Sequence, residues 1–461
     1  MHMPLGRFLF LYTLLSSFLA APTLRADDWP EWLGPKRDGI WRETGLIDQF
    51  PKDGPKVLWR KPIHDGYAGP AVVGDRVYVM ERERPLDEDG KPVKPTRAGI
   101  PGTERVLCLS AIDGKQIWKD EYDAPYKISY PNGPRVTPLI RDGRVYTLGA
   151  VGDLRCLDAD KGDVIWSKNV AKEYHQKPPV WGWATHLLLD GDLLYCLVGA
   201  EGSAVVAFNK KDGKEVWKAL STKEIGYSPP MIFDLAGKKT LVVWLSESIN
   251  GLDPAKGTVL WTHAYPEDIE VKRPAVNIST VLRDKDRLFL TSFYHGPMML
   301  EIAGDKPQAK VVWKSKSNDP GKPEGLNCVM GTPALKDGYL YGLGGMGELQ
   351  CVKADTGEKQ WESKKVLGED KAFCGTAFLI QKGDQFILFN DHGDLILAEL
   401  TPKEYKEISR AHLLDPTQKG FERDVVWSHP AFARRCVFAR NDKEIICVSL
   451  AAGKKTEGVK P

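Results

Sequence analysis

Hydrophobic and polar residues alternate along short segments of this chain, and the same arrangement of segments returns down its length. Residues 135–142, 144–150, 154–160 and 163–168 each alternate in this way, and Asp-Gly or Gly-Asp pairs mark the bends between them. A period of two residues bounded by such turns predicts β-strands joined by hairpins. No segment has convincing helical periodicity, so we expect an all-β protein with little helix.

A tryptophan in the fourth strand of the unit marks the repeat. In five copies a glycine precedes it by four positions: Gly114 and Trp118, Gly162 and Trp166, Gly213 and Trp217, Gly257 and Trp261, Gly357 and Trp361. Trp59 in "KVLW" and Trp313 in "KVVW" keep the apolar part of the phrase without the glycine. Successive tryptophans are separated by 59, 48, 51, 44, 52 and 48 residues. A period of about 50 residues is typical of a four-stranded propeller blade. We expect each tryptophan to wedge between neighbouring sheets.

A second pattern gives the number of blades. The first strand of each unit opens on a small residue or proline, as expected where sheets converge near a propeller axis and bulky side chains would collide. These openings are Gly69-Pro70, Thr137-Pro138, Thr185-His186, Ser228-Pro229, Ile278-Ser279, Thr332-Pro333, Thr376-Ala377 and His429-Pro430. They predict eight blades.

The two ends of the chain are predicted to close the ring together. Trp59 belongs to a strand that precedes the first opening, whereas the last unit supplies three strands and no fourth. Residues 56–61 therefore complete the last blade, and this closure removes free sheet edges. Residues 404–411 serve as the outer strand of the seventh blade, without a tryptophan. The prediction is one eight-bladed propeller of four-stranded antiparallel blades over residues 56–452.

The remaining segments lie at the termini. Residues 1–26 are interpreted as a signal peptide, cut after Ala26 or near Ala20, and the apolar run from Phe8 to Leu19 is too short to span a bilayer. Residues 27–55 form an extension that packs on the propeller, and residues 453–461 a disordered tail. Since the first cysteine is Cys108, we expect no lipid anchor. The mature protein is placed in the periplasm or outside the cell, as a monomer.

Charge and cysteines exclude several classes of function. Lys plus Arg number 64 and Asp plus Glu 62, a net charge of +2 that does not favour nucleic acid or anionic membranes. Of the eight cysteines, Cys108, Cys156, Cys351 and Cys447 occupy the same strand position in different blades, too far apart for disulfides, and are interpreted as small buried hydrophobes. The redox state of Cys196, Cys328, Cys374 and Cys436 stays open. No spacing suggests a zinc site.

The repeat resembles a known superfamily. Residues 142–166, "DGRVYTLGAVGDLRCLDADKGDVIW", are similar to the repeat of the pyrroloquinoline-quinone (PQQ)-like β-propellers, which include quinoprotein alcohol dehydrogenases and BamB-like proteins. The likeness covers about residues 57–450. Residues 28–41 and 424–450 resemble more narrowly the exported PQQ-like proteins of planctomycetes and related bacteria. The repeat is specific for the fold and a poor guide to function.

Three functional hypotheses follow. The favoured one is a binding scaffold without catalysis or cofactor, for a protein, peptide or glycan partner. The alternative is a quinoprotein dehydrogenase that oxidises alcohols or sugars, for which the resemblance implies PQQ, calcium and an aspartate base. Such enzymes typically carry two adjacent cysteines against the quinone, and this sequence has no Cys-Cys pair. A hydrolase or lyase on the same ring is the third.

Any ligand site is expected where the loops from each outer strand to the next inner strand meet around one mouth of the channel. The candidates are Tyr67, Arg135, Trp183, His186, Tyr227, Arg273, Asn277, Met330, Phe373 and His429. No catalytic residue or metal ligand is assigned among them.

Several local segments have two readings. The stretch "NDHGD" (390–394) suggests a metal or acid–base site, although a plain turn is favoured. "VWGWATH" (180–186) offers rings for stacking or for the core, and "VKRPAVNIS" (271–279) an anion clamp or a solvated loop charge. The insertion between Arg82 and Thr103 is interpreted as a mobile hairpin extension that could also reach a partner.

Overall fold

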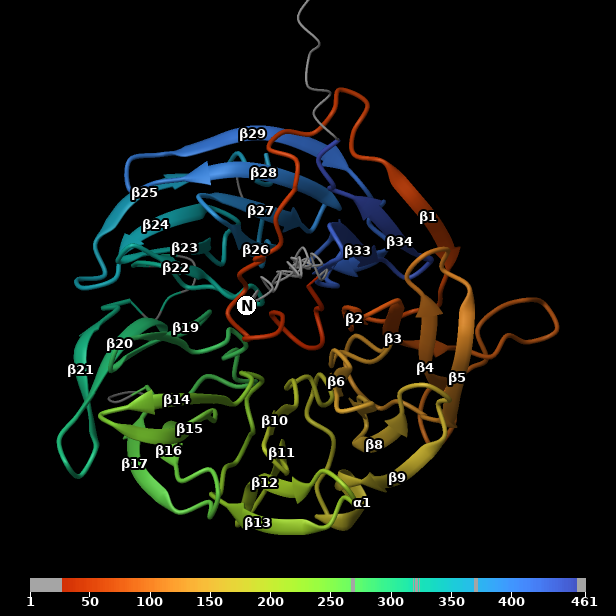
Figure 1. Cartoon of the computed structure of the whole chain (residues 1–461). Coiled ribbons are helices and arrows are strands. Elements are labelled where there is room, and N and C mark those ends of the chain that lie inside the picture. Colours follow the sequence, from red (N-terminus) through yellow and green to blue (C-terminus); the bar gives the residue numbers. More distant parts are fainter. Residues whose placement is uncertain are drawn as a thin grey trace, which may run out of the picture.

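The structure is a computed structural model, and it describes residues 27–453 apart from 267–269, 318, 320, 321, 323 and 369–371. The strands form a closed ring of eight antiparallel four-stranded sheets around a central axis, so the predicted fold is confirmed (Figure 1). The predicted signal peptide lies outside the described residues, as does the predicted tail apart from its first residue.

In blades 1 to 7 the strands follow in chain order from the axis outward, whereas the outer strand of blade 8 is β1. Blade 1 contains β2 (Ala71–Val73), β3 (Arg76–Glu83), β4 (Thr103–Ser110) and β5 (Gln116–Asp123); blade 2, β6 (Leu139–Arg141), β7 (Arg144–Leu148), β8 (Asp153–Asp158) and β9 (Val164–Asn169); blade 3, β10 (Leu188–Asp190), β11 (Leu193–Ala200), β12 (Ser203–Asn209) and β13 (Glu215–Ala219); blade 4, β14 (Met231–Leu235), β15 (Lys238–Trp244), β16 (Ser248–Leu252) and β17 (Val259–Ala264). Blade 5 contains β18 (Leu282–Asp284), β19 (Arg287–Ser292), β20 (Gly296–Ala303) and β21 (Gln308–Lys314); blade 6, β22 (Ala334–Lys336), β23 (Tyr339–Leu343), β24 (Leu349–Lys353) and β25 (Lys359–Ser363); blade 7, β26 (Ala377–Lys382), β27 (Gln385–Asn390), β28 (Asp394–Leu400) and β29 (Tyr405–His412); blade 8, β32 (Ala431–Ala433), β33 (Cys436–Arg440), β34 (Glu444–Ser449) and β1 (Val57–Pro62). The short helix α1 (Val170–Glu173) follows β9, and a hairpin of β30 (Gln418–Gly420) and β31 (Arg423–Val425) precedes blade 8.

Blade 8 joins the two ends of the chain, as predicted. Strand β1 pairs antiparallel with β34, and Trp59 lies opposite Cys447 in the register. The outer strand of the last blade therefore comes from the start of the propeller, and no blade is left one strand short.

The repeated glycine has a structural role beyond the bend. A Cβ added to Gly162 would lie 2.6 Å from the ring of Trp118 in the preceding blade, and the other four glycines face Trp59, Trp166, Trp217 and Trp313 in the same way. The indole nitrogen of Trp118 donates to the carbonyl of Ala159, 3.0 Å away in the next blade. Each glycine thus leaves space for the tryptophan of the preceding blade. The indole N–H of that tryptophan in turn binds a backbone carbonyl in the turn that contains the glycine.

This contact explains why two copies of the repeat lack the glycine. Trp59 has no glycine four positions before it, and the preceding blade 7 has no tryptophan in β29 to be accommodated. Blade 5 has Ala309 at this position, and the indole nitrogen of Trp261 in blade 4 is buried without a hydrogen-bond partner among the described residues. The glycine therefore belongs to the seam between blades rather than to its own blade.

Substitution of one seam glycine tests this role. Gly162 has φ +79° and faces Trp118, whereas Gly143 has φ +71° and has nothing within 4 Å of the position of an added Cβ. Both Gly→Ala changes force alanine into the left-handed region, at a cost of roughly 1–2 kcal/mol. Gly162→Ala should lower the free energy of unfolding by a further ~1–3 kcal/mol, because the methyl group displaces the indole. Denaturant titration of the two variants measures the difference, and equal losses would contradict the seam contact.

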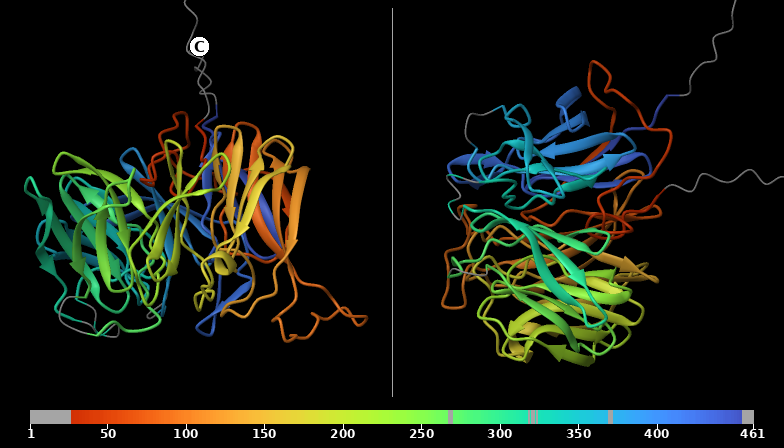
Figure 2. Two further views of the ribbon diagram at one scale, coloured as in Figure 1. Left: turned by 90° about the horizontal axis from the view of Figure 1, so that it is seen from below. Right: turned by 90° about the vertical axis from the view of Figure 1, so that its left-hand side faces the viewer.

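The two faces of the ring differ in the loops that they carry. The turns within each blade between its first and second strands lie on the face that is covered by the N-terminal extension, which we call the plugged face; Trp29 pairs with Val72 and Gly39 with Gln381 there. The loops from each outer strand to the next inner strand lie on the opposite face, which we call the mouth face. The insertion between β3 and β4 projects from the mouth face, away from the N-terminal extension (Figure 2).

Candidate functional site

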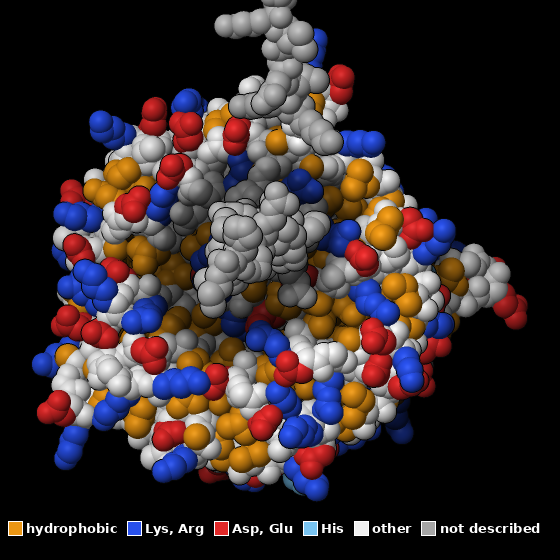
Figure 3. Space-filling model, in the orientation of Figure 1, with side chains coloured by type: hydrophobic (Ala, Val, Ile, Leu, Met, Phe, Trp, Pro, Cys, Tyr) orange, Lys and Arg blue, Asp and Glu red, His pale blue; other side chains and the backbone are white. Residues whose placement is uncertain are grey.

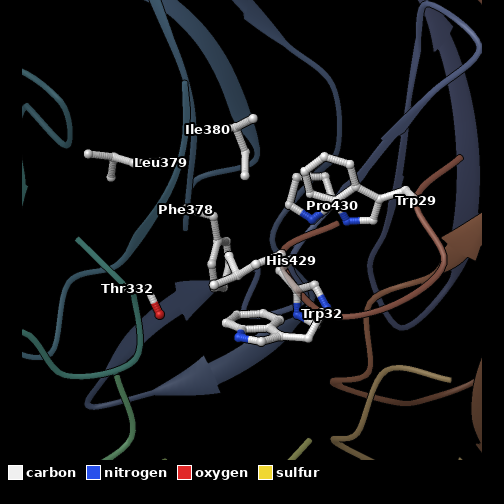
Figure 4. A pocket seen from close by; sticks show the side chains of 9 residues that line it. Trp29, Trp32, Thr332, Phe378, Leu379, Ile380, His429 and Pro430 are labelled. Carbon is white, nitrogen blue, oxygen red and sulfur yellow. The ribbon is translucent and has the colours of Figure 1, made fainter. Parts of the chain in front are cut away.

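The axial channel is filled on the plugged face by Trp32. Its ring stacks on His186 with centroids 4.3 Å apart and meets His429 edge-on at 4.4 Å. The indole nitrogen donates to Oγ1 of Thr280 at 2.9 Å, and the side chain is buried. Residues just before the inner strands of blades 3, 5 and 8 thus hold one tryptophan of the extension. Figure 4 shows Trp32 beside His429.

A buried ion pair fixes the same segment. Arg37 lies 2.6 Å from Glu31 and also donates to the carbonyl oxygen of Leu187 at 2.8 Å, while Glu31 binds Arg141 at 2.6 Å. The cavity beside Trp32 has a volume of only about 10 Å³, which is room for about one water molecule. Acidic and basic side chains are interspersed around the rim of this face (Figure 3). Among the described residues, the extension fills the axis on the plugged face and leaves room for about one water molecule beside Trp32.

The two histidines under Trp32 are held neutral. The backbone N–H of Thr137 donates to Nδ1 of His186 at 3.1 Å, and Oγ1 of Thr137 lies 2.5 Å from Nε2 of His429. Burial lowers the pKa of His429 to about 3. Burial, together with the charges of His429 and Arg37, lowers the pKa of His186 well below its ordinary value.

These pKa shifts predict acid sensitivity of the fold. The unfolded chain takes up a proton on His429 near pH 6.5, whereas the folded chain resists protonation down to about pH 3. The stability that His429 contributes by staying neutral in the folded protein is therefore fully present above pH ~6.5. As the pH falls below this value, the free energy of unfolding decreases by about 1.4 kcal/mol per pH unit. Unfolding titrations between pH 7 and pH 4 should show at least this slope, because His186 adds to it, and His429→Gln should reduce the slope by about 1.4 kcal/mol per pH unit. An unchanged slope in that variant would contradict the assignment.

The structure does not bring all ten predicted site residues to one mouth. Trp183 is fully buried in the core between blades 2 and 3, where its indole nitrogen donates to the carbonyl of Leu197 at 3.1 Å. His186 and His429 lie under the plug on the other side of the channel. The side chain of Asn277 is also buried, and it donates to the carbonyl of Leu245 at 2.9 Å. Their position at strand openings puts these side chains inside the ring rather than at its rim.

Two predicted arginines are bound within the protein. Arg135 donates to the backbone carbonyls of Ser129 and Gly133 and lies over the ring of Tyr67, 5.1 Å from its centroid. Arg273 bridges Glu224 at 3.1 Å and Glu247 at 2.5 Å. Both side chains stabilise loops of the mouth face, so the proposed anion clamp in 271–279 is occupied by carboxylates of the protein itself.

The other candidates lie among aromatic residues on loops of the mouth face. Tyr67 and Phe373 belong to a chain of ring contacts with centroid distances of 4.9–6.5 Å. We call this set the aromatic arc; its members are Tyr67, Tyr130, Trp427, Phe421, Phe373 and Phe293. Tyr227 forms a separate pair with Trp181 at 5.2 Å, and Met330 packs beside Phe293.

The hairpin of β30 and β31 presents the most exposed ring of the arc. Its two-residue turn consists of Phe421 and Glu422, with φ of 49° and 66°. Left-handed φ at two residues other than glycine costs free energy, and such strain clusters at functional sites. The turn holds Phe421 46% exposed, 4.9 Å from the ring of Phe373, which is 39% exposed. Two phenylalanines thus form an apolar tip on this face.

Sequence reasoning missed Phe421, Trp427, Tyr130 and the role of Trp32. The turn at Phe421 has neither Gly nor Asn, so it gives no hairpin signal. The available signal was the presence of an aromatic residue in several loops that join an outer strand to the next inner strand.

Polar side chains beside the arc are already paired. Asp391, which is fully buried, binds Arg423 at 3.0 Å and accepts a hydrogen bond from the backbone N–H of Thr376. Burial raises the pKa of Asp391 and the Arg423 guanidinium opposes this shift. Asp442 accepts hydrogen bonds from Gly66 and Gln418. The site therefore presents apolar surface bounded by satisfied polar groups.

The described residues offer no donor set for a metal. Within that part of the chain, no three His, Cys, Asp or Glu side chains gather in an arrangement that could hold a metal ion. The segment 390–394 forms the turn between β27 and β28, as favoured from its sequence. Asp391 and Asp394 from this turn serve ion pairs with Arg423 and Arg410.

Comparison with known proteins places the chain in a family. A family model described as outer membrane protein assembly factor BamB matches residues 102–341 and, again, residues 245–460. The chain belongs to this BamB family. Outer membrane protein assembly factor BamB of Moranella endobia is 23% identical over 312 residues, which span 61% of this chain and 72% of that protein.

The BamB family likeness extends to structure. The crystal structure of BamB from Moraxella catarrhalis superposes with a TM-score of 0.54 at 16% identity, and the match covers 80% of this chain and all of that one. A quinoprotein ethanol dehydrogenase of Pseudomonas putida is 31% identical over 184 residues, only 36% of this chain and 27% of the enzyme. The described part of this BamB family member contains no helix long and apolar enough to span a membrane.

Proposed function

We propose that the protein is a non-catalytic scaffold that binds another protein through the aromatic arc. The observation that carries this proposal is the exposed pair of Phe421 and Phe373, held by a strained hairpin on the mouth face. Exposed aromatic anchors surrounded by satisfied polar groups resemble the centre of a protein interface. A glycan would instead require free hydrogen-bonding groups, whereas Asp391, Arg135 and Asp442 are engaged within the protein.

The family supports a role in assembly after export. Relatives in this family are named for the assembly of outer membrane proteins. A periplasmic or extracellular site of action, as a monomer, is part of the same proposal and agrees with the interpretation of residues 1–26.

The dehydrogenase alternative finds less support in the described residues. A calcium ion with PQQ would need a set of oxygen ligands in the mouth, and no group of three candidate metal-binding side chains gathers in the part of the chain described here. The nearby carboxylate of Asp391 is held by Arg423. We therefore derive no oxidation step for this chain.

Site-specific crosslinking tests the proposal. A photoreactive amino acid replaces Phe421 in the exported chain, and a second chain carries it at Ile112, which is 65% exposed on the plugged face. The expected result is one defined protein adduct from position 421 that is absent from position 112. Equal adducts from both positions would contradict a binding site at the arc, and calcium-dependent dye reduction by the purified protein with PQQ would refute the scaffold role.

A further inference from the structure

Blade 8 brings two cysteines together on adjacent strands. In the register of β33 and β34, Cys436 lies opposite Ser449 and Phe438 lies opposite Cys447. Residues two apart on a strand share a face, so Cys436 and Cys447 are diagonal neighbours on one face of the sheet. Both are buried, with Cys436 7% and Cys447 0% exposed.

Other blades have an arginine at the first of these two positions. In blade 1 the diagonal neighbour of Cys108 is Arg76, whose guanidinium opposes the rise that burial causes in the pKa of the Cys108 thiol. In blade 2 Arg144 has the same relation to Cys156. Blade 8 has Cys436 where these blades have arginine. The closing blade therefore places a second thiol against the repeated cysteine.

The environment makes one of the two thiols the better nucleophile. A hydrogen bond from Cys447 lowers the pKa of Cys436, with burial opposing and the charges of Arg434 and Arg435 assisting. The pKa of Cys447 shifts in the opposite direction, because the same hydrogen bond and burial raise it. A thiolate stabilised beside a second thiol is the arrangement that thiol–disulfide exchange requires.

We propose that Cys436 and Cys447 form a disulfide when the protein meets a disulfide oxidant, and that this bond fixes β33 to β34. The Cys436 thiolate attacks one sulfur of the oxidant and displaces the other as a thiolate. Cys447 then gives up its proton and attacks the Cys436 sulfur, which expels the second oxidant thiolate. Two electrons and two thiol protons thus pass to the oxidant, which leaves as two thiols.

The position of Cys436 and Cys447 in blade 8 determines which strands the disulfide would hold together. Strand β34 also pairs with β1, and Cys447 lies opposite Trp59 in that pairing. A bond between β33 and β34 would therefore hold the strand that joins both ends of the chain. The N-terminal extension covers this edge: Glu43 accepts a hydrogen bond from the backbone of Arg435 at 2.8 Å, and Ile47 donates to Leu450 at 2.9 Å. Oxidation should be fastest before the extension docks.

Thiol mapping tests the inference. The reduced protein is unfolded and refolded with glutathione disulfide, then denatured, alkylated and digested. The expected product is one disulfide between the peptides that contain Cys436 and Cys447, with six of the eight cysteines alkylated. Oxidised protein should also melt at a higher temperature than reduced protein.

Matched variants distinguish this pair from general oxidation. Cys436→Ser should abolish both the disulfide and the difference in melting temperature. Cys156→Ser, at the position in blade 2 that is equivalent to Cys447, should leave both intact. Recovery of all eight cysteines as alkylated thiols after refolding, or a disulfide between other cysteines, would overturn the proposal.

Discussion

Trp59→Ala should be among the most destabilising single substitutions in this propeller, with a loss of about 3–5 kcal/mol in the free energy of unfolding. Trp59 is 7% exposed and lies at the seam where the first and last parts of the propeller meet. Its ring covers Gly114 in blade 1, and its indole nitrogen donates to the carbonyl of Ala111 at 3.0 Å. Removing the ring leaves a cavity and an unpaired buried carbonyl together. Denaturant titration followed by circular dichroism measures the loss.

A control lies in the same strand. Leu58 is 45% exposed, so Leu58→Ala should change the free energy of unfolding by no more than about 0.5 kcal/mol. Comparable losses in the two variants would show that β1 contributes by strand pairing alone, and that the packing of Trp59 at the seam has no special weight.

The double substitution of Phe373 and Phe421 by alanine should weaken binding of the partner by about 30-fold or more. Clustered aromatic anchors at the centre of an interface typically contribute at least ~2 kcal/mol, and each 1.4 kcal/mol corresponds to a factor of ten in Kd. Both rings are partly exposed, at 39% and 46%, so the fold should lose little stability. Titration calorimetry with the crosslinked partner, once purified, measures the affinity.

Ile112→Ala is the matched control for that experiment, because Ile112 is 65% exposed and lies on the plugged face. Its affinity should equal that of the unmodified protein. An unchanged Kd in the double variant would remove the arc from the interface, and an equal loss in Ile112→Ala would indicate a second contact surface.

The architecture could be predicted because the sequence repeats the pattern of one blade many times. The tryptophan phrase and the small residues at strand openings are independent patterns, and the missing fourth strand of the last unit pointed to residues 56–61. Pairing of β1 with β34 confirms this closure. The glycine was assigned to a turn, although its contact with a tryptophan of the preceding blade is equally important. A periodic signal within one blade does not reveal what the next blade packs against it.

The candidate site could be predicted only as a region. Four of the predicted residues do lie on loops of the mouth face: Tyr67, Tyr227, Met330 and Phe373. Trp183, however, is buried in the core, and His186 packs against Trp32 of the N-terminal extension. These outcomes depend on side-chain direction within non-repeating loops, for which a single sequence carries no periodic signal. Trp32 was equally hidden, since its three partners come from distant blades.

Closure by β1 also orders the events of folding. Val57–Pro62 leaves the ribosome before any blade, yet its partner β34 is among the last strands to be made. Contacts between such distant parts of a chain form slowly, because a long loop must be restricted before they can form. The ring must remain an open arc until synthesis is nearly complete, with its first strand exposed and in need of protection from other chains during that interval.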